Sequence, residues 1–313
     1  MAYTLLRGKP VKEAVEAEMM HSIAELKERG ISPTVAVLRV GENAGDIYYQ
    51  NSINRNAEKY GMSCVNAVFP DGTPQEDLED ALKQLNLDVN IHGIIMMMPF
   101  PKYVQEDRMR QLLAPEKDID AITDQSYAYL FTNRPAAEVY YACTAEACME
   151  ILRRNGIEIS GKKVTIVGRS LRIGKPLMLM MMNANATVTV CHTRTKPEDL
   201  KNACRNADIV VLATGQIESF GPEFFHDGQI IVDAGTGTGS DGKIAGDFNA
   251  KALTERGEPA ELVYTPVPGG VGAVTTTLLL RNVVKAAESN AVNTDAVWYR
   301  VGDGTTRGLE QDI

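Results

Sequence analysis

Short apolar runs alternate with segments of helical period along most of the chain. Seven short runs of apolar and β-branched residues predict strands, at residues 34–40, 63–69, 91–98, 164–167, 187–191, 208–213 and 229–234. The first helix is expected over residues 10–30, with a proline near its first turn and a glycine at its end. Strands and helices that alternate at this rhythm are typical of parallel sheets joined by crossover helices.

The pattern and the length of 313 residues predict two α/β domains, because a single hydrophobic core usually stops growing near ~250–300 residues. We expect the first domain over residues 1–145 and the second, Rossmann-like domain over residues 146–270. A final helix at about residues 271–290 is expected to pack back on the first domain. The polar end, residues 291–313, is expected to form a tail that is loosely ordered or docked on a partner subunit.

The charge and the cysteines limit the class of protein. A formal net charge of −9 and an isoelectric point near 5.1 argue against a nucleic-acid or anionic-membrane partner. The five cysteines are scattered and lack metal-ligand spacing, which favours reduced thiols in a cytoplasmic protein and predicts no metal site. No segment approaches ~20 uninterrupted apolar residues, so no membrane span is expected. Because the whole chain is acidic, an anionic ligand would have to bind at a site with its own lysine or arginine side chains.

Residues 164–176 carry a binding signal, because four apolar or β-branched residues end at Gly168 and Gly174 opens the next helix. Glycine tolerates the tight turn after the strand and lets the helix begin close to it. The unpaired N–H groups at such a helix start favour a pyrophosphate, so the stretch predicts dinucleotide binding. Its spacing differs from G-x-G-x-x-G, and Pro176 excludes a Walker loop. A tight turn that binds no ligand is the alternative.

Several separated motifs occur in one order along the chain. They are Val40-Gly41-Glu42-Asn43 before Tyr49, the run from Gly93 to Pro101, Pro115-Glu116-Lys117-Asp118-Ile119-Asp120, the Gly168 turn, and Thr265-Pro266-Val267-Pro268-Gly269-Gly270-Val271-Gly272. Together they resemble the methylenetetrahydrofolate dehydrogenase/cyclohydrolase family, from Gly8 to about Ala287. The last run, joined at the expected distance to Gly-Arg-Ser-x-x-x-Gly-Lys-Pro, makes the resemblance highly specific.

The resemblance implies a homodimer whose subunits have a cleft between a folate-binding and an NAD(P)-binding domain. Bifunctional members of the family oxidise 5,10-methylenetetrahydrofolate by hydride transfer to NAD(P), then hydrolyse the methenyl cation to 10-formyltetrahydrofolate. In the family an Asp binds the amino group and ring N–H of the pterin. A Tyr packs near the reacting carbon, and a Lys with a Gln partner carries out the hydrolysis.

Two of these roles carry over to this chain. Asp120 matches the pterin-binding Asp, and a carboxylate suits that role because it offers two acceptors to two adjacent donors. Tyr49 matches the family Tyr. A loop carboxylate and an ordinary surface or core aromatic are the alternatives for these two residues. The resemblance also implies substrate contacts from Pro268, Gly269 and Gly270.

The other two roles are not filled. Four residues after Tyr49, one helical turn away, the family has its Lys and this chain has Ile53. The family's Gln is Met97 here. Attack of water on a methenyl cation needs a polar or ionisable group within about 3 Å, so cyclohydrolase activity is expected to be absent or severely reduced. Hydride transfer mainly needs the two carbons held in line, which an apolar lining does not forbid.

The donors near the expected adenosine ribose favour NADP over NAD. Arg169, Ser170 and the residues after the strand at 187–191 supply cationic and hydroxyl groups, and no acidic residue ends that strand. His192 itself is more often a polar loop residue than a catalyst. The segment from Gly235 to Gly239 resembles the family loop beside the nicotinamide. The expected cofactor-binding residues are Gly168, Arg169, Ser170, Ile173, Gly174, His192, Thr193, Arg194 and Thr236.

Three functions are compatible with the sequence. The first is an NADP-dependent methylenetetrahydrofolate dehydrogenase without effective cyclohydrolase activity. The second is a paralogue that acts on a different folate or one-carbon substrate. Four departures from the family pattern in the cleft fit it: Ala121 in place of Gly, and Ala142, Ala145 and Ala273 in place of Pro. The third is a non-catalytic folate- or nucleotide-binding protein, although the intact glycine turn and Arg194 favour a protein that still uses its nucleotide.

Overall fold

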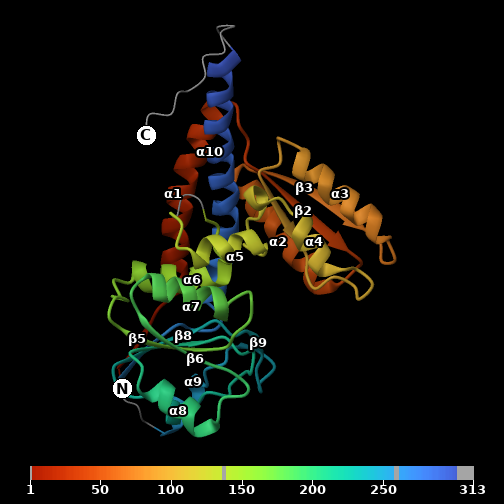
Figure 1. Ribbon diagram of the computed structural model, residues 1–313. Helices are drawn as coiled ribbons and strands as arrows, with labels where there is room; N and C mark the ends of the chain where they lie inside the picture. Colours follow the sequence, from red (N-terminus) through yellow and green to blue (C-terminus); the bar gives the residue numbers. More distant parts are fainter. Residues whose placement is uncertain (1, 136–138, 257–260, 302–313) are drawn as a thin grey trace.

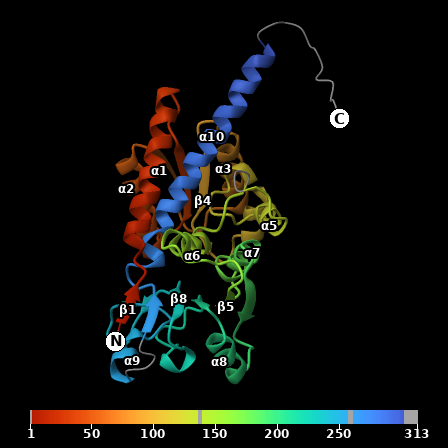
Figure 2. The same cartoon turned by 90° about the vertical axis from the view of Figure 1, so that its left-hand side faces the viewer.

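The protein has two α/β domains, each built on a parallel sheet, as predicted (Figure 1). The computed structural model describes residues 2–135, 139–256 and 261–301. The α1 and α10 helices lie side by side along the first domain in both views (Figures 1 and 2). The second domain lies at one end of this helix pair, with α6 and α7 between its sheet and the first domain.

The first domain contains, among the described residues, a three-stranded parallel sheet in the order β3-β2-β4. Its central strand is buried along its whole length, and alternate residues of that strand face two separate hydrophobic clusters. The elements are α1 (Gly8–Glu28), β2 (Thr34–Val40), α2 (Ala44–Tyr60), β3 (Ser63–Phe69), α3 (Gln75–Leu87), β4 (Gly93–Met96), α4 (Glu106–Leu112), the 3-10 turn η1 (Pro115–Lys117), α5 (Asp124–Phe131) and the returning α10 (Thr275–Val301).

The second domain contains a six-stranded parallel sheet within the described ranges, in the order β1-β11-β8-β7-β5-β6. Successive residues of β7 face opposite clusters, so helices cover both faces. The elements are β1 (Ala2–Leu5), α6 (Cys143–Arg154), β5 (Lys163–Val167), α7 (Gly174–Asn183), β6 (Thr187–Cys191), α8 (Pro197–Arg205), β7 (Ile209–Leu212), η2 (Pro222–Phe224), β8 (Gln229–Asp233), β9 (Gly237–Thr238), β10 (Ile244–Ala245), α9 (Ala250–Arg256), β11 (Glu261–Tyr264) and η3 (Val271–Ala273).

The N-terminal strand departs from the predicted division of the chain. We assigned residues 1–145 to the first domain, but β1 pairs in parallel with β11 at the edge of the second sheet. Neither strand was predicted from the sequence. The pairing between them joins segments more than 250 residues apart, so local pattern carries little of the signal.

The C-terminal helix is longer than the sequence suggested. After the short η3 turn, α10 runs from Thr275 to Val301 and packs against α1, β2 and β4 of the first domain. Residues 291–301, predicted as the start of a tail, therefore continue the helix. The rest of the predicted tail, residues 302–313, lies outside the described residues. In the part of the chain that the structure describes, no helix is both long enough and apolar enough to cross a membrane.

Candidate active site

The turn between β5 and α7 has the close backbone approach that the sequence predicted. Gly168 has φ 133°, and a Cβ atom there would lie 2.3 Å from the carbonyl oxygen of Ala213. A Cβ atom on Gly174 would lie 2.2 Å from the Gly168 oxygen. The turn is closed by Ser170, whose hydroxyl accepts the Ile173 N–H at 3.1 Å. Only glycine fits at positions 168 and 174, so the backbone itself can approach a ligand.

A cavity of about 420 Å³ lies beside this turn, at the carboxyl ends of β5, β6 and β7. Such a crevice outside the strand ends is where nucleotides bind in open parallel sheets. Five predicted cofactor residues line it, namely Gly168, Arg169, Ser170, His192 and Thr193. Thr195, in the same run after β6 that the sequence singled out for its hydroxyl and cationic groups, also lines it. The sequence missed Thr214, Gln216, Leu200, Phe220 and Phe224, which line it as well. None of its described lining residues is a carboxylate, so a phosphate would meet no like charge there.

His192 is held in a tight turn by two hydrogen bonds. Its backbone N–H donates to the Thr195 hydroxyl at 2.9 Å, and its Nδ1 accepts the Arg194 N–H at 3.2 Å. In the neutral ring the proton is therefore on Nε2, which makes that nitrogen a donor. Arg194 is exposed and does not line the cavity described above. The same is true of the exposed Thr236.

Two buried carboxylates support the loop that the resemblance places near the nicotinamide. Asp233 accepts the N–H groups of Gly235 and Phe248, each at 2.9 Å. Burial raises the pKa of Asp233 to about 6. Asp247 accepts the N–H and hydroxyl of Thr214, at 2.7 and 2.9 Å. The residues that follow form the short β9–β10 hairpin instead of an irregular connection.

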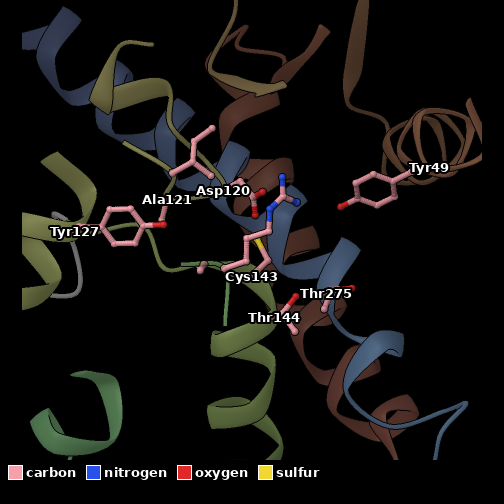
Figure 3. Close-up of a pocket in the computed structure, with 10 residues that line it drawn as sticks. Tyr49, Asp120, Ala121, Tyr127, Cys143, Thr144 and Thr275 are labelled. Atoms are coloured by element: carbon pink, nitrogen blue, oxygen red, sulfur yellow. The ribbon is translucent and has the colours of Figure 1, made fainter. Parts of the chain in front are cut away.

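A second pocket, of about 240 Å³, lies where the two domains meet (Figure 3). The Tyr49 hydroxyl, carried by α2, points toward Asp120, which follows η1. The pocket thus brings together the two residues that the sequence selected for folate binding. It is lined by Tyr49, Asp120, Ala121, Ile122, Tyr127, Ala142, Cys143, Thr144, Arg172 and Thr275.

Asp118, which the sequence did not select, holds the loop that carries Asp120. Its carboxylate is fully buried and accepts the N–H groups of Ile122 and Thr123 at 2.9 and 2.8 Å. It also accepts the Ser126 hydroxyl at 2.6 Å. With its own oxygens occupied, Asp118 is a structural anchor for the loop.

Burial governs ionisation in the pocket. It raises the pKa of Asp120 to about 6, although the Arg172 guanidinium acts in the opposite direction. Burial and the nearby Asp120 raise the pKa of Tyr49 above its ordinary range, so its hydroxyl stays protonated. Burial likewise raises the pKa of the Cys143 thiol well above its usual value. At neutral pH the tyrosine and cysteine are therefore neutral donors, and Asp120 is mostly a carboxylate.

Ile53 and Met97 lie together in the apolar interior of the first domain. Ile53 is 0% exposed and Met97 is 4% exposed, and both belong to a cluster with Ile119 and Cys143. Tyr49 packs against the same cluster. Neither side chain has an atom that can exchange a proton.

The Pro268–Gly270 segment packs on the start of α1 and does not line the pocket. The Gly8 N–H donates to the Gly269 oxygen at 2.8 Å, and a Cβ atom on Gly8 would lie 2.2 Å from the Gly270 oxygen. This contact fixes the entry into α10, whose first residue, Thr275, does line the pocket. The role predicted for the segment itself stays a prediction.

The sequence missed Arg172, Tyr127, Thr144 and Thr275 as lining residues. Arg172 belongs to the stretch that contains the glycine turn, so the sequence shows its positive charge. The sequence does not show which cavity its side chain enters. A cavity at the strand ends and an adjoining polar pocket between two α/β domains are typical of one class of protein, nucleotide-dependent oxidoreductases with two domains.

The comparisons with known proteins identify the member of that class. The chain belongs to the tetrahydrofolate dehydrogenase/cyclohydrolase family. The family's catalytic domain matches residues 6–120, and its NAD(P)-binding domain matches residues 142–291. This confirms the resemblance read from the sequence and the expectation of a nicotinamide dinucleotide.

Individual relatives agree over almost their whole length. The chain is 38% identical over 285 residues to the bifunctional protein FolD of Carboxydothermus hydrogenoformans, covering 90% of this chain and 96% of the relative. The crystal structure of bifunctional FolD from Campylobacter jejuni has a TM-score of 0.86 and 32% identity, with 92% and 99% covered. FolD of Trypanosoma brucei, solved with NADP and an inhibitor, has a TM-score of 0.84 and 30% identity, with 93% and 99% covered.

Replacing Asp120 by Asn should stabilise the ligand-free protein at pH 8. The folded-state pKa is about 6 against an ordinary value of 3.8, so the folded state binds the proton more tightly and stability falls as the pH rises from about 4 to 6. Asn removes this loss. We expect the variant's free energy of unfolding in urea to exceed that of the wild type by about 1–3 kcal/mol at pH 8, with the difference shrinking toward pH 4. A less stable variant at pH 8 would contradict the burial argument.

Replacing Ala121 by Gly should also stabilise the fold. Ala121 has φ 52°, a left-handed conformation that costs an L residue with a Cβ atom about 1 kcal/mol. We expect a gain of about 0.5–1 kcal/mol in urea unfolding. Ala142, which lines the same pocket at φ −54°, is the control, and Ala142→Gly should lose stability. Equal effects of the two changes would show that Ala121 is not strained.

Proposed function

We propose that the protein is an NADP-dependent methylenetetrahydrofolate dehydrogenase whose cyclohydrolase activity has been lost. The observation that carries the proposal is the burial of Ile53 and Met97 in one apolar cluster beside Tyr49. At the positions of the family's Lys and Gln there is thus no polar atom. The nucleotide cavity and Asp120 support retention of the first reaction.

The arrangement of the two cavities supports hydride transfer. The turn after β5 borders both, since Arg169 and Ser170 line the nucleotide cavity and Arg172 lines the pocket at the domain junction. A nucleotide bound at Gly168 and a pterin bound at Asp120 would therefore be separated by one turn of backbone. When bound, NADP supplies the acceptor for the hydride that leaves the methylene carbon. The protein's part is to hold the two partners in line.

Asp120 and Tyr49 have separate roles in this proposal. The Asp120 carboxylate accepts hydrogen bonds from the amino group and ring N–H of the pterin, which fixes the ring. Tyr49 keeps its proton and presents an uncharged aromatic wall and hydroxyl, so it can pack beside the reacting carbon without exchanging a proton.

Loss of hydrolysis follows from the proton acceptors in the pocket. Water that attacks a methenyl cation must lose a proton, and Tyr49 and Cys143 hold theirs because burial raises their pKa values. Arg172 has no acceptor atom. Of the described lining residues, Asp120 alone is basic near neutral pH, and both of its oxygens are engaged when the pterin is bound.

The charge of the nucleotide cavity supports NADP over NAD. Arg169 lines it together with the hydroxyls of Ser170, Thr193 and Thr195, and its described lining contains no acidic residue. A 2′-phosphate gains from such donors, whereas a free ribose hydroxyl is typically held by an Asp or Glu.

We also propose a homodimer in the cytoplasm. The β3 strand is an open edge of the first sheet, and Val65 and Val68 on it are each 41% exposed. An exposed edge with apolar side chains favours pairing with a second copy. The cysteines, which are all free in the described structure, are consistent with a reducing compartment.

Purified protein given methylenetetrahydrofolate and NADP should form reduced nucleotide and methenyl product in equal amounts, and the methenyl product should then accumulate. Its decay should match the buffer rate, because general acid–base assistance worth about 10²–10⁴-fold is missing. Absorbance of the two products, followed separately, measures both steps. No formation of reduced nucleotide would reject the dehydrogenase, and rapid decay of the methenyl product would reject the loss of hydrolysis.

The variant Ile53→Lys with Met97→Gln serves as the matched comparison in that assay and should gain measurable hydrolysis. Ile53→Lys alone should gain little, because an amine against Met97 has no polar partner, which lowers its pKa and costs stability. Asp120→Ala should lose folate binding and keep nucleotide binding.

NADP should bind more tightly than NAD, and Arg169→Ala should reduce the difference between the two affinities. A lost charge-assisted contact to phosphate costs about 1.5–3 kcal/mol, and NAD affinity should hardly change. Calorimetry with both nucleotides measures the two affinities. Arg194→Ala is a second variant, which tests the exposed arginine after β6. Arg205, exposed on α8 and outside the cavity lining, is the control position. Equal affinities of the wild type for NADP and NAD would remove the proposal.

A further inference from the structure

Arg172 brings a positive charge from the second domain into the pocket at the domain junction. Of the described lining residues of that pocket, Arg172 is the only cation and Asp120 the only carboxylate. Neither of the two forms an ion pair within the described structure. Their charges nevertheless interact, since the guanidinium lowers the pKa of Asp120 against the effect of burial. The two side chains therefore face a common space that a ligand can occupy.

The backbone that carries Arg172 is held from both sides. On its own domain the Ser170 hydroxyl accepts the Ile173 N–H at 3.1 Å and closes the turn. From the first domain the Tyr127 hydroxyl donates to the Leu171 carbonyl oxygen at 2.9 Å. Tyr127 also lines the pocket. The tip of the turn is thus tied to the pocket wall, and Arg172 is presented to it by tertiary contacts.

We propose that Arg172 is a specificity-determining residue that donates a hydrogen bond to the ring oxo oxygen of the bound pterin. The inference rests on the proposed function, in which Asp120 accepts from the ring N–H and the amino group. Those two donors and the oxo oxygen lie in a row on one edge of a 2-amino-4-oxo pterin. A carboxylate with two acceptors and a guanidinium with a planar fork of donors match that row.

Charge also favours this pairing. A guanidinium is too weakly acidic to lose its proton, so it can act only as a donor and a positive charge. The oxo oxygen is an acceptor, and it gains from a charged donor beside the carboxylate that binds its neighbours. A pterin whose oxo group is replaced by an amino group would present a donor to the Arg172 donors, which costs affinity. The same replacement removes the ring N–H that Asp120 accepts, so the two residues share the preference for the oxo compound.

The test compares tetrahydrofolate with its 4-amino-4-deoxy counterpart in the wild type, Arg172→Met and Arg172→Lys. We expect the wild type to bind the oxo compound about 10- to 100-fold more tightly than the amino compound. Arg172→Met should weaken binding of the oxo compound by about 10-fold or more and reduce the preference. The part of the preference that remains belongs to Asp120, which meets a ring N–H in the oxo compound and a bare ring nitrogen in the amino compound. Arg172→Lys keeps a charged donor without the planar fork and should fall between the two.

Arg169→Met is the matched control, because Arg169 lies three residues earlier in the same turn and lines the nucleotide cavity instead. It should weaken NADP binding and leave the preference for the oxo pterin unchanged. Arg172→Met should keep the affinity for NADP within about twofold of the wild type. Thermal melting checks that each variant folds. If Arg172→Met does not fold, the comparison of Arg172→Lys with the wild type still decides the test.

The outcomes separate the two levels of the argument. If the wild type binds tetrahydrofolate but Arg172→Met and Arg172→Lys bind it as tightly and prefer it by the same factor, the role of Arg172 is wrong and the proposed function survives. If Arg172→Met weakens the binding of NADP as much as the binding of tetrahydrofolate, Arg172 contacts the nucleotide and the inference is overturned. If the wild type binds neither pterin, the proposed function itself fails.

Discussion

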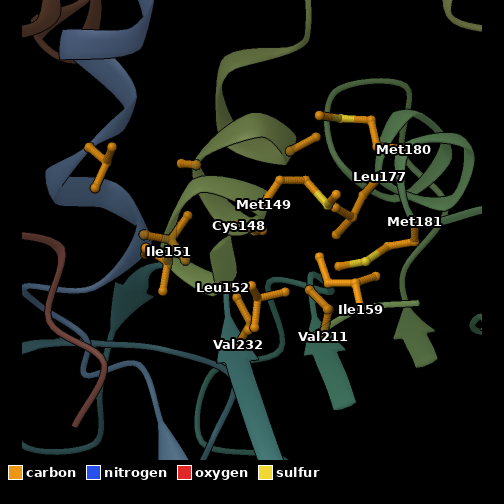
Figure 4. Packing of buried hydrophobic residues seen from close by; sticks show 14 of the residues in the cluster. Cys148, Met149, Ile151, Leu152, Ile159, Leu177, Met180, Met181, Val211 and Val232 are labelled. Carbon is orange, nitrogen blue, oxygen red and sulfur yellow. The ribbon is translucent and has the colours of Figure 1, made fainter. Parts of the chain in front are cut away.

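The apolar packing around α6 holds the two domains in one arrangement, and both cavities depend on it. Figure 4 shows Met149 and Leu152 directed toward α7 and the strands of the second sheet, while Ile151 lies on the side of α10. The same cluster includes residues of α1 and the start of α10. Each such side chain contributes about 1.5–3 kcal/mol when fully buried. Because the cluster belongs to both domains, the distance between the glycine turn and the Asp120 loop is set by core packing.

The turn after β5 is a wall shared by two cavities. Its backbone must pass within van der Waals contact of the β7 end and of its own helix start, so Gly168 and Gly174 cannot carry side chains. The residues between them then project to different sides, with Arg169 toward the nucleotide cavity and Arg172 toward the domain junction. One local backbone geometry thereby supplies a cation to each of the two cavities.

Ile53 and Met97, which the resemblance aligns with the family's Lys and Gln, lie in the core of the first domain. Ile53 and Met97 add apolar area to the cluster beneath Tyr49, and such burial stabilises the fold. A lysine in that surrounding would be desolvated and would need a polar partner. Stability and hydrolysis thus make opposite demands at the same two positions. Hydride transfer makes no such demand, because its requirement is alignment of two carbons.

The sequence by itself determined the local elements and the chemistry of the site. It predicted β2, β3 and β6 at their observed bounds, because each is a short run of mostly apolar or β-branched residues between turn signals. It also selected the Gly168 turn and Asp120, which line the two cavities. The β1–β11 pairing was missed because it joins segments more than 250 residues apart, which no local pattern links. The direction of Arg172 was decided only by the tertiary structure. A side chain at the tip of a turn has no local preference for one cavity, so the docking of the two domains chooses it.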